Sequence, residues 1–138
     1  MDKKEALKIV QNYGPDLENL PTHFKKDKKI VLKAVKVFGF PLQFADESLK
    51  KDRKFILEVV KQSGIALFYA DESLKKDKEI VITALKKEGT ALEYAHKSFR
   101  KDKKIVLIAL NQNSRALEYA DKSFWKDPDI LAMVNKKK

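Results

Sequence analysis

The sequence predicts an all-α fold, a solenoid-like array of short helix pairs built from five 25-residue repeats and a C-terminal capping helix. Three observations predict it: an aspartate returns every 25 residues from Asp2 to Asp127, glycine and leucine keep the same register, and apolar residues within each repeat have helical spacing. Such a fixed period is typical of stacked supersecondary units. The predicted domain, residues 1–138, divides into repeats at about 2–26, 27–51, 52–76, 77–101 and 102–126, with the capping helix at 127–135.

The first half of each repeat is predicted to be a helix that begins after the recurring aspartate. Asp27, in the second repeat, has the side chain of an N-cap, which accepts hydrogen bonds from free backbone N–H groups of the first turn. Apolar residues recur at helical spacing from Ile30 to Phe38, which predicts a helix over residues 28–38. We expect Gly39 to end this helix in the left-handed conformation that glycine adopts at little cost.

The second half of the repeat predicts a shorter helix over residues 41–49, because Leu42, Ala45 and Leu49 have helical spacing. Either one bent helix or two turns with a break near Asp46 is consistent with this segment. Neither helix is long enough to be stable alone, so stacking of the repeats must complete the core.

The two ends of the chain differ from the middle as terminal repeats should. The first repeat carries Glu5 where later repeats have isoleucine or phenylalanine, which is typical of a more polar cap. In the last, incomplete copy Pro128 follows Asp127, and proline suits the first position of a helix. This copy is therefore predicted to be the single closing helix.

The segments at 76–81 (KDKEIV) and 89–95 (GTALEYA), recurring at this period, resemble the short repeats collected as the domain-of-unknown-function family numbered 4116. The resemblance covers nearly the whole chain and implies an array of short α-helical repeats. It implies no activity and no catalytic residues. Three residues depart from the pattern: Ser114 replaces a glycine, His96 an aspartate, and Trp125 a basic residue.

The composition of the chain excludes several kinds of site and segment. The chain has no cysteine, which excludes disulfides and thiolate metal sites, and it has neither an apolar run long enough to span a membrane nor a signal peptide. We therefore expect a soluble, monomeric protein of the cytoplasm. The formal net charge of +10 favours anionic partners, although solubility explains a basic surface equally well.

Basic windows at 25–29, 50–54, 75–79 and 100–104 follow the repeat. With units stacked about 10 Å apart, they are expected to form a ridge about 30 Å long, able to bind a phosphate backbone or an acidic protein. The alternative is that these are loops kept soluble by lysine, and the preference for lysine over arginine favours it. The candidate anion-binding residues are Lys25, Lys26, Lys28, Lys29, Lys50, Lys51, Arg53, Lys54, Lys75, Lys76, Lys78, Arg100, Lys101, Lys103 and Lys104.

Positions that vary between repeats mark the candidate binding surface, because core positions must repeat while exposed positions can drift. The candidate contacts for a protein partner are Phe40, Phe68, Ile108 and Trp125. For Trp125, packing under the closing helix is an equal alternative. A second set of aromatic residues occurs once per repeat, and packing at the edge of the core explains it better than stacking on nucleic-acid bases. These residues are Phe44, Tyr69, Tyr94 and Tyr119.

The sequence contains no recognisable catalytic or metal-binding motif. The acidic pairs at 46–47 and 71–72 recur with the repeat, which favours helix capping over catalysis, and the two histidines, His23 and His96, lack metal-ligand spacing. We therefore expect no enzyme and no cofactor. The predicted function is a protein-interaction scaffold, and the alternative is nucleic-acid or polyanion binding through the basic ridge.

Overall fold

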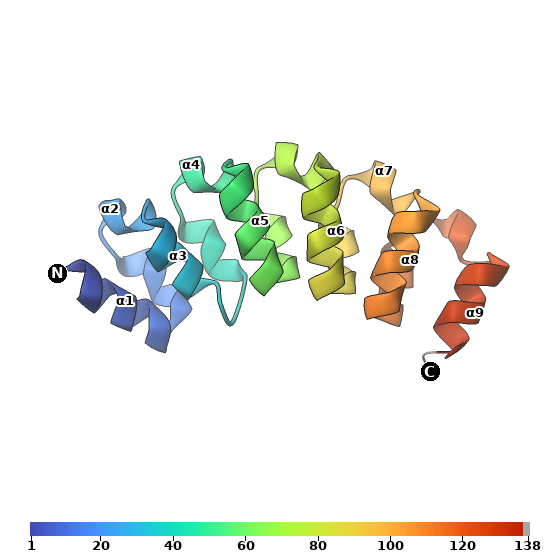
Figure 1. Cartoon of the computed structure of the whole chain (residues 1–138), viewed down its shortest axis with the longest axis horizontal. Coiled ribbons are helices and arrows are strands. Elements are labelled where there is room, and N and C mark those ends of the chain that lie inside the picture. The colour runs from blue at the N-terminus through green and yellow to red at the C-terminus, as the bar shows by residue number, and fades with distance from the viewer. Residues whose placement is uncertain (137–138) are drawn as a thin grey trace.

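The computed structural model describes residues 1–136, and every regular element in that range is helical. Figure 1 shows the repeats following one another along an arched array, with the two termini at opposite ends. The main α-helices are α1 (Lys3–Asn12), α3 (Lys28–Ala34), α5 (Arg53–Gln62), α6 (Lys78–Lys87), α8 (Lys103–Gln112) and α9 (Pro128–Lys136). The array is an all-α stack of repeats, as predicted.

Each repeat contains two further helical segments after its main helix. The first is a 3-10 helix: η1 (Gly14–Asn19), η2 (Phe40–Phe44), η3 (Gly64–Tyr69), η5 (Gly89–Tyr94) or η6 (Ser114–Tyr119). The second is a short piece: α2 (Thr22–Lys25), α4 (Glu47–Lys50), η4 (Glu72–Lys76), α7 (Lys97–Arg100) or η7 (Lys122–Phe124). The predicted second helix is thus two separate pieces, and in the second repeat the break falls at Ala45, whose backbone is extended.

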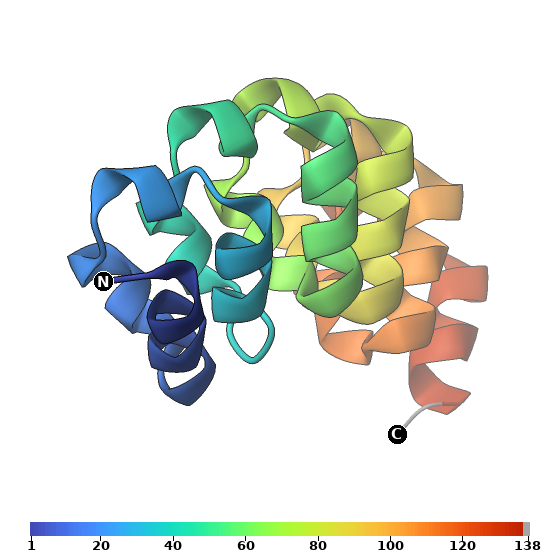
Figure 2. The same cartoon turned by 60° about the vertical axis from the view of Figure 1, so that its left-hand side comes forward.

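The elements form two packed layers and one edge. Each main helix packs on the next, each 3-10 helix packs on the next, and the two layers face each other. Figure 2 shows the main helices side by side, with the short pieces along the upper edge. Between the layers lies a core that repeats the same positions, such as Ile30, Ala34 and Leu42, all of which are buried.

Adjacent repeats are also joined by backbone hydrogen bonds. The carbonyl of the first residue in each basic window accepts from an N–H in the following repeat, as in the bond from Asp71 N to Lys50 O at 3.0 Å. The equivalent bonds run from Asp46 to Lys25, from His96 to Lys75 and from Asp121 to Arg100. The first position of each window is therefore part of the framework as well as of the surface.

The recurring aspartates are helix N-caps, as predicted. Asp52 accepts from the backbone N–H of Phe55 at 3.0 Å, and Asp27 accepts from Lys29 and Ile30. In the last copy Asp127 accepts from Ile130, so the closing helix begins at Pro128. The closing helix is described over Pro128–Lys136.

The main helix of the second repeat is shorter than the predicted 28–38. It ends at Ala34, and Val37 and Phe38 are exposed although Phe38 was expected on the buried stripe. Pro41 explains the difference, because it lacks the N–H that the equivalent Ala66 donates to Ser63 O at 3.2 Å. Without this bond the connection between α3 and η2 takes an irregular path.

The expectation that Gly39 is left-handed was wrong. Its φ is −72°, and no residue in the described part of the chain has positive φ. The glycines are required by close packing instead: a Cβ on Gly64 or Gly89 would overlap the carbonyl oxygen of Ala84 or Ala109 in the next repeat. Each 3-10 helix can therefore begin directly against the following main helix.

Within residues 1–136, no helix combines the length and apolar character that a membrane span requires.

Candidate interaction surface

The fourth residue of each basic window lies at the boundary between two repeats. Lys28 Nζ lies 3.0 Å from Asp52, and Arg53 Nε donates to Asp77 at 2.6 Å while its Nη2 donates to Glu79. Lys103 pairs in the same way with Asp127, and Lys3 with Asp27. Lys78 is exposed, and in the described structure no ion pair joins it to Asp102. The paired cations, unlike Lys78, are partly neutralised by the N-cap aspartate of the next repeat.

These contacts change the pKa values of the capping aspartates. The Arg53 guanidinium is the largest influence that holds the pKa of Asp77 below its ordinary value, and Lys103 does the same for Asp127. For Asp52 the backbone N–H of Phe55 lowers the pKa most, followed by Lys28. The aspartates are therefore ionised at neutral pH, and each one binds a helix N-terminus and a cation together.

The first residue of each window belongs to the short piece on the upper edge. Lys50 Nζ donates to the Gln43 carbonyl at 2.7 Å and to Glu47 at 3.1 Å. Lys75 Nζ donates to Glu72 at 2.7 Å and lies 5.3 Å from the ring centre of Phe68. Lys25 and Arg100 are half-buried at the equivalent position. Of these four residues, Lys75 and Arg100 line grooves between repeats.

The other window residues are exposed to solvent. They form two rows: the second positions Lys26, Lys51, Lys76 and Lys101, and the fifth positions Lys29, Lys54 and Lys104. The residues of the predicted ridge thus differ in environment. The first position belongs to the short pieces, the fourth lies at the repeat boundaries, and the second and fifth lie on the open surface. Only the two exposed rows present lysines as a simple basic surface.

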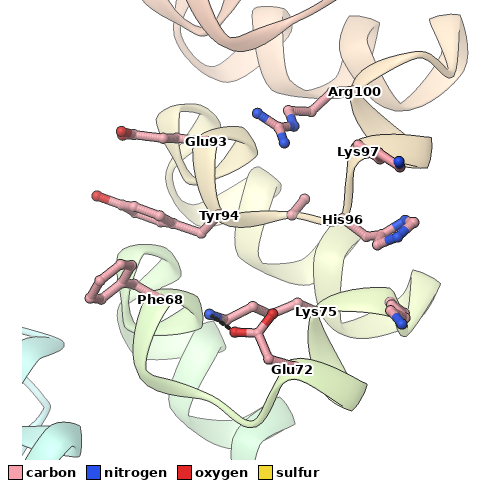
Figure 3. Close-up of a pocket in the computed structure, with 10 residues that line it drawn as sticks. Phe68, Glu72, Lys75, Glu93, Tyr94, His96, Lys97 and Arg100 are labelled. Carbon is pink, nitrogen blue, oxygen red and sulfur yellow. Dashed lines mark hydrogen bonds and ion pairs between the residues drawn. The ribbon is translucent and has the colours of Figure 1, made fainter.

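Two grooves lie at boundaries between repeats. One of about 360 Å³ lies between the third and fourth repeats, and is lined by Phe68, Lys75, Tyr94, His96 and Arg100 among others. Figure 3 shows Arg100 extending from α7 toward η5, with Lys75 paired to Glu72 below. The next groove, of about 470 Å³, is lined by Lys97, Arg100, Tyr119 and Trp125. Each of the two grooves therefore combines aromatic and basic side chains.

The recurring aromatic residues line the edge of the core, as the packing interpretation predicted. Phe44, Tyr69, Tyr94 and Tyr119 are half-buried against it. Burial is the main cause that raises the pKa of Tyr94, whereas the nearby charge of Glu93 is the main cause for Tyr119. The hydroxyl groups of Tyr94 and Tyr119 therefore stay neutral, and the rings of these two residues line the grooves.

Exposed apolar side chains occur on η2 and η3 and just before η2, and together they are called the apolar cluster. Phe38, Phe40, Ile65 and Phe68 are 53%, 36%, 37% and 51% exposed, and the rings of Phe38 and Phe40 lie 6.0 Å apart. Ile65 and Phe68 are three residues apart on a 3-10 helix, so they project from the same side. In η5 and η6 the same positions carry Thr90, Glu93, Arg115 and Glu118. The surface therefore changes from apolar to charged along the array.

The four predicted partner contacts do not form one patch. Phe40 and Phe68 belong to the apolar cluster, whereas Ile108 on α8 is half-buried against the core. Trp125 is 43% exposed, and its Nε1 donates to the Leu117 carbonyl at 3.0 Å. Trp125 therefore lies against η6 rather than beneath the closing helix.

The acidic pairs and His96 act as local caps. Asp46 accepts from the N–H of Ser48 at 3.0 Å, Asp71 does so from Ser73, and His96 Nδ1 replaces the carboxylate by accepting from Ser98 at 3.2 Å. In the described residues, no three histidine, aspartate or glutamate side chains lie together as metal ligands would. These side chains are accounted for by the fold.

The repeat period and these contacts agree with the comparison to protein families. The family described as "Domain of unknown function (DUF4116)" matches residues 2–50, 29–76, 52–100 and 77–125. The chain belongs to the DUF4116 family. No curated protein and no solved structure matches it. Each DUF4116 match spans about two repeats, which is the unit needed to form one ion pair and one groove.

Sequence reasoning missed the division of roles within the basic windows of this DUF4116 chain. The signal was present, because Lys3, Lys28 and Arg53 each precede the aspartate of the next repeat by 24 residues. It also missed the grooves, which depend on the break between the 3-10 helix and the short piece. That break determines which side chains face each other.

Proposed function

We propose that this chain is a non-enzymatic scaffold that binds a partner protein along the outer face of its 3-10 helices. The exposed apolar cluster formed by Phe38, Phe40, Ile65 and Phe68 carries the proposal. Exposed aromatic residues that stand together favour protein contact, since they supply large apolar area at low entropic cost. The first groove, which Phe68 also lines, and the second groove beyond it extend this surface along the array.

The repeat architecture supports a binding role rather than catalysis. Histidine and the acidic pairs are used for capping, and the arginine and lysines at the boundaries bind the next aspartate. An extended stack offers a long surface on which side chains vary from repeat to repeat while the core stays constant. Such a surface suits recognition of an extended protein segment.

Affinity capture from cells that naturally make the protein tests this proposal. The intact chain is compared with a Phe40→Ser, Phe68→Ser variant and with a control, Lys54→Ser, Lys104→Ser, which changes two exposed residues elsewhere. We expect specific proteins to be retained by the intact chain and the control and lost from the phenylalanine variant. Equal capture by all three would contradict the proposal, and circular dichroism checks that each variant is folded.

Polyanion binding is the second candidate, and the exposed row Lys26, Lys51, Lys76 and Lys101 favours it. Such a row can follow a phosphate backbone, with affinity that falls as salt rises. Fluorescence anisotropy with single-stranded and duplex oligonucleotides at several salt concentrations tests it. Tight binding that is lost in a Lys51→Glu, Lys76→Glu variant would support this candidate, and weak binding even at low salt would remove it.

A further inference from the structure

The fourth repeat breaks a charge pattern that the second and third repeats share. Lys50 pairs with Glu47 at 3.1 Å, and Lys75 pairs with Glu72 at 2.7 Å, in both cases across three residues of the short piece. In the fourth repeat Lys97 stands at the position of these glutamates, and Arg100 at the position of the lysines. Two cations therefore replace an ion pair on the upper edge.

Arg100 is held in a position that leaves part of its guanidinium without a partner. Its Nε atom is buried and makes no hydrogen bond in the described structure. Because Nε is shielded from solvent, a ligand in the groove reaches the guanidinium through its terminal Nη groups. The two terminal Nη–H groups of an arginine match the two oxygens of a carboxylate.

Lys97 and Arg100 line both of the grooves that flank the fourth repeat. Phe68 and Tyr94 are in the wall of the first groove, and Tyr119 and Trp125 are in the wall of the second. His96 occupies the place of an aspartate, which removes a further negative charge. Figure 3 shows Arg100 reaching from α7 toward η5, the element that carries Tyr94.

We propose that Arg100 and Lys97 bind the carboxylate side chain of an acidic segment in a partner protein, with a neighbouring apolar residue of that segment against Phe68. This inference rests on the proposed scaffold function, because Phe68 belongs to both the apolar cluster and the first groove. It specifies the chemistry of the partner: glutamate or aspartate close to an apolar side chain, in an extended conformation.

The acidic residues in the grooves favour a protein segment over a nucleic acid. Glu93 lines the first groove and Glu118 the second, on either side of Arg100. A phosphate backbone carries a charge at every nucleotide and would meet both glutamates, whereas a peptide can place one carboxylate at Arg100 and uncharged groups beside Glu93 and Glu118. The mixed charge of the grooves thus selects for isolated negative charges.

A labelled peptide with one glutamate beside one phenylalanine, flanked by uncharged residues, tests this inference, together with a matched peptide in which glutamine replaces the glutamate. The decisive variant is Lys97→Glu, which introduces the glutamate of the second and third repeats and offers Arg100 an internal partner. Lys86→Glu, on an exposed position of α6, makes the same change in net charge as a control. Fluorescence anisotropy measures the dissociation constants.

We expect the glutamate peptide to bind the intact chain, with roughly tenfold weaker binding to Lys97→Glu and less than about a twofold change for Lys86→Glu. Equal weakening by both variants, equal binding of the glutamine peptide, or no binding of the glutamate peptide would overturn the inference. An oligonucleotide that binds the intact chain more tightly than the peptide does, and whose binding is weakened by Lys97→Glu, would also overturn the inference. The scaffold proposal is tested separately, since the Phe40→Ser, Phe68→Ser capture experiment does not involve Lys97.

Discussion

The backbone of Gly64 packs directly against the carbonyl oxygen of Ala84 in the next repeat, at the point where a Cβ atom would lie. Gly14 and Gly89 have the same relationship to Ala34 and Ala109. Contact between a 3-10 helix and the following main helix therefore depends on a missing side chain. This requirement concerns packing alone, because none of the described glycines has positive φ.

Gly64→Ala should lower the free energy of unfolding by about 1 to 3 kcal/mol, because the new methyl group forces the two repeats apart. The matched control is Ser114→Ala, at the equivalent position of the fifth repeat, where a side chain is already accommodated; its effect should stay within about 0.5 kcal/mol. Urea unfolding followed by circular dichroism measures both. Equal effects of the two substitutions would contradict the packing role of Gly64.

Asp77→Ala should cost about 1 kcal/mol of stability, the usual effect of removing an N-cap. Asp77 Oδ1 accepts from Ile80 N at 3.2 Å, and the same carboxylate binds Arg53. Asp77→Asn should cost less, since asparagine keeps the capping acceptor and loses only the charge. Urea unfolding of both variants separates the cap from the ion pair, and an equal loss in the two would show that the charge, not the cap, is what matters.

Stability should fall in acid because the folded chain lowers the pKa of Asp52, Asp77 and Asp127 below the ordinary value of 3.8. The unfolded chain then binds protons more readily than the folded chain. The stabilisation is fully present above the unfolded pKa, and it is lost as the pH falls from about 4 through the folded values. Urea midpoints measured from neutral pH to about pH 2.5 check this, and Asp77→Asn should show a shallower decline. A midpoint that does not change across this range would contradict it.

Pro41→Ala should lengthen α3. An alanine supplies the N–H that Ala66 donates in the third repeat, and Phe38 N can then donate to Ala34 O, as Ser63 N does to Val59 O at 2.9 Å. Amide exchange measured by NMR should show that the Phe38 amide becomes protected. Pro15→Ala is the control, because the N–H of its neighbour Asp16 already bonds to Tyr13 O. A Phe38 amide that still exchanges rapidly would mean that another feature shortens α3.

The framework of the fold could be predicted from the sequence because each of its contacts is local and repeated. Asp27 as a cap, Leu42 as a core residue and Pro128 as a helix start follow from elementary rules that act within a few residues. Their recurrence at one period then implies stacking. The family matches agree with this repeat length over nearly the whole chain.

The remaining features depend on contacts between repeats, which periodicity does not describe. The function of Gly64 is determined by Ala84, and the environment of Arg53 by Asp77, each in the following repeat. The irregular end of α3 follows from one missing N–H at Pro41. Arg100 has a different environment from Lys75 because Lys97 stands where Lys75 has its ion-pair partner, Glu72. The consequence of this change of charge can be seen only when the residues that line the groove are known.

Hydroxyl-radical footprinting of the captured complex tests most directly whether the partner binds the outer face of the 3-10 helices. Phe40 and Phe68 are exposed in the free chain and should be oxidised there. We expect both to be protected when the partner is bound, while acetylation of Lys54 and Lys104 stays unchanged. Unchanged oxidation of the two phenylalanines, with protection of the lysines instead, would contradict the proposed surface and place the partner on the basic rows.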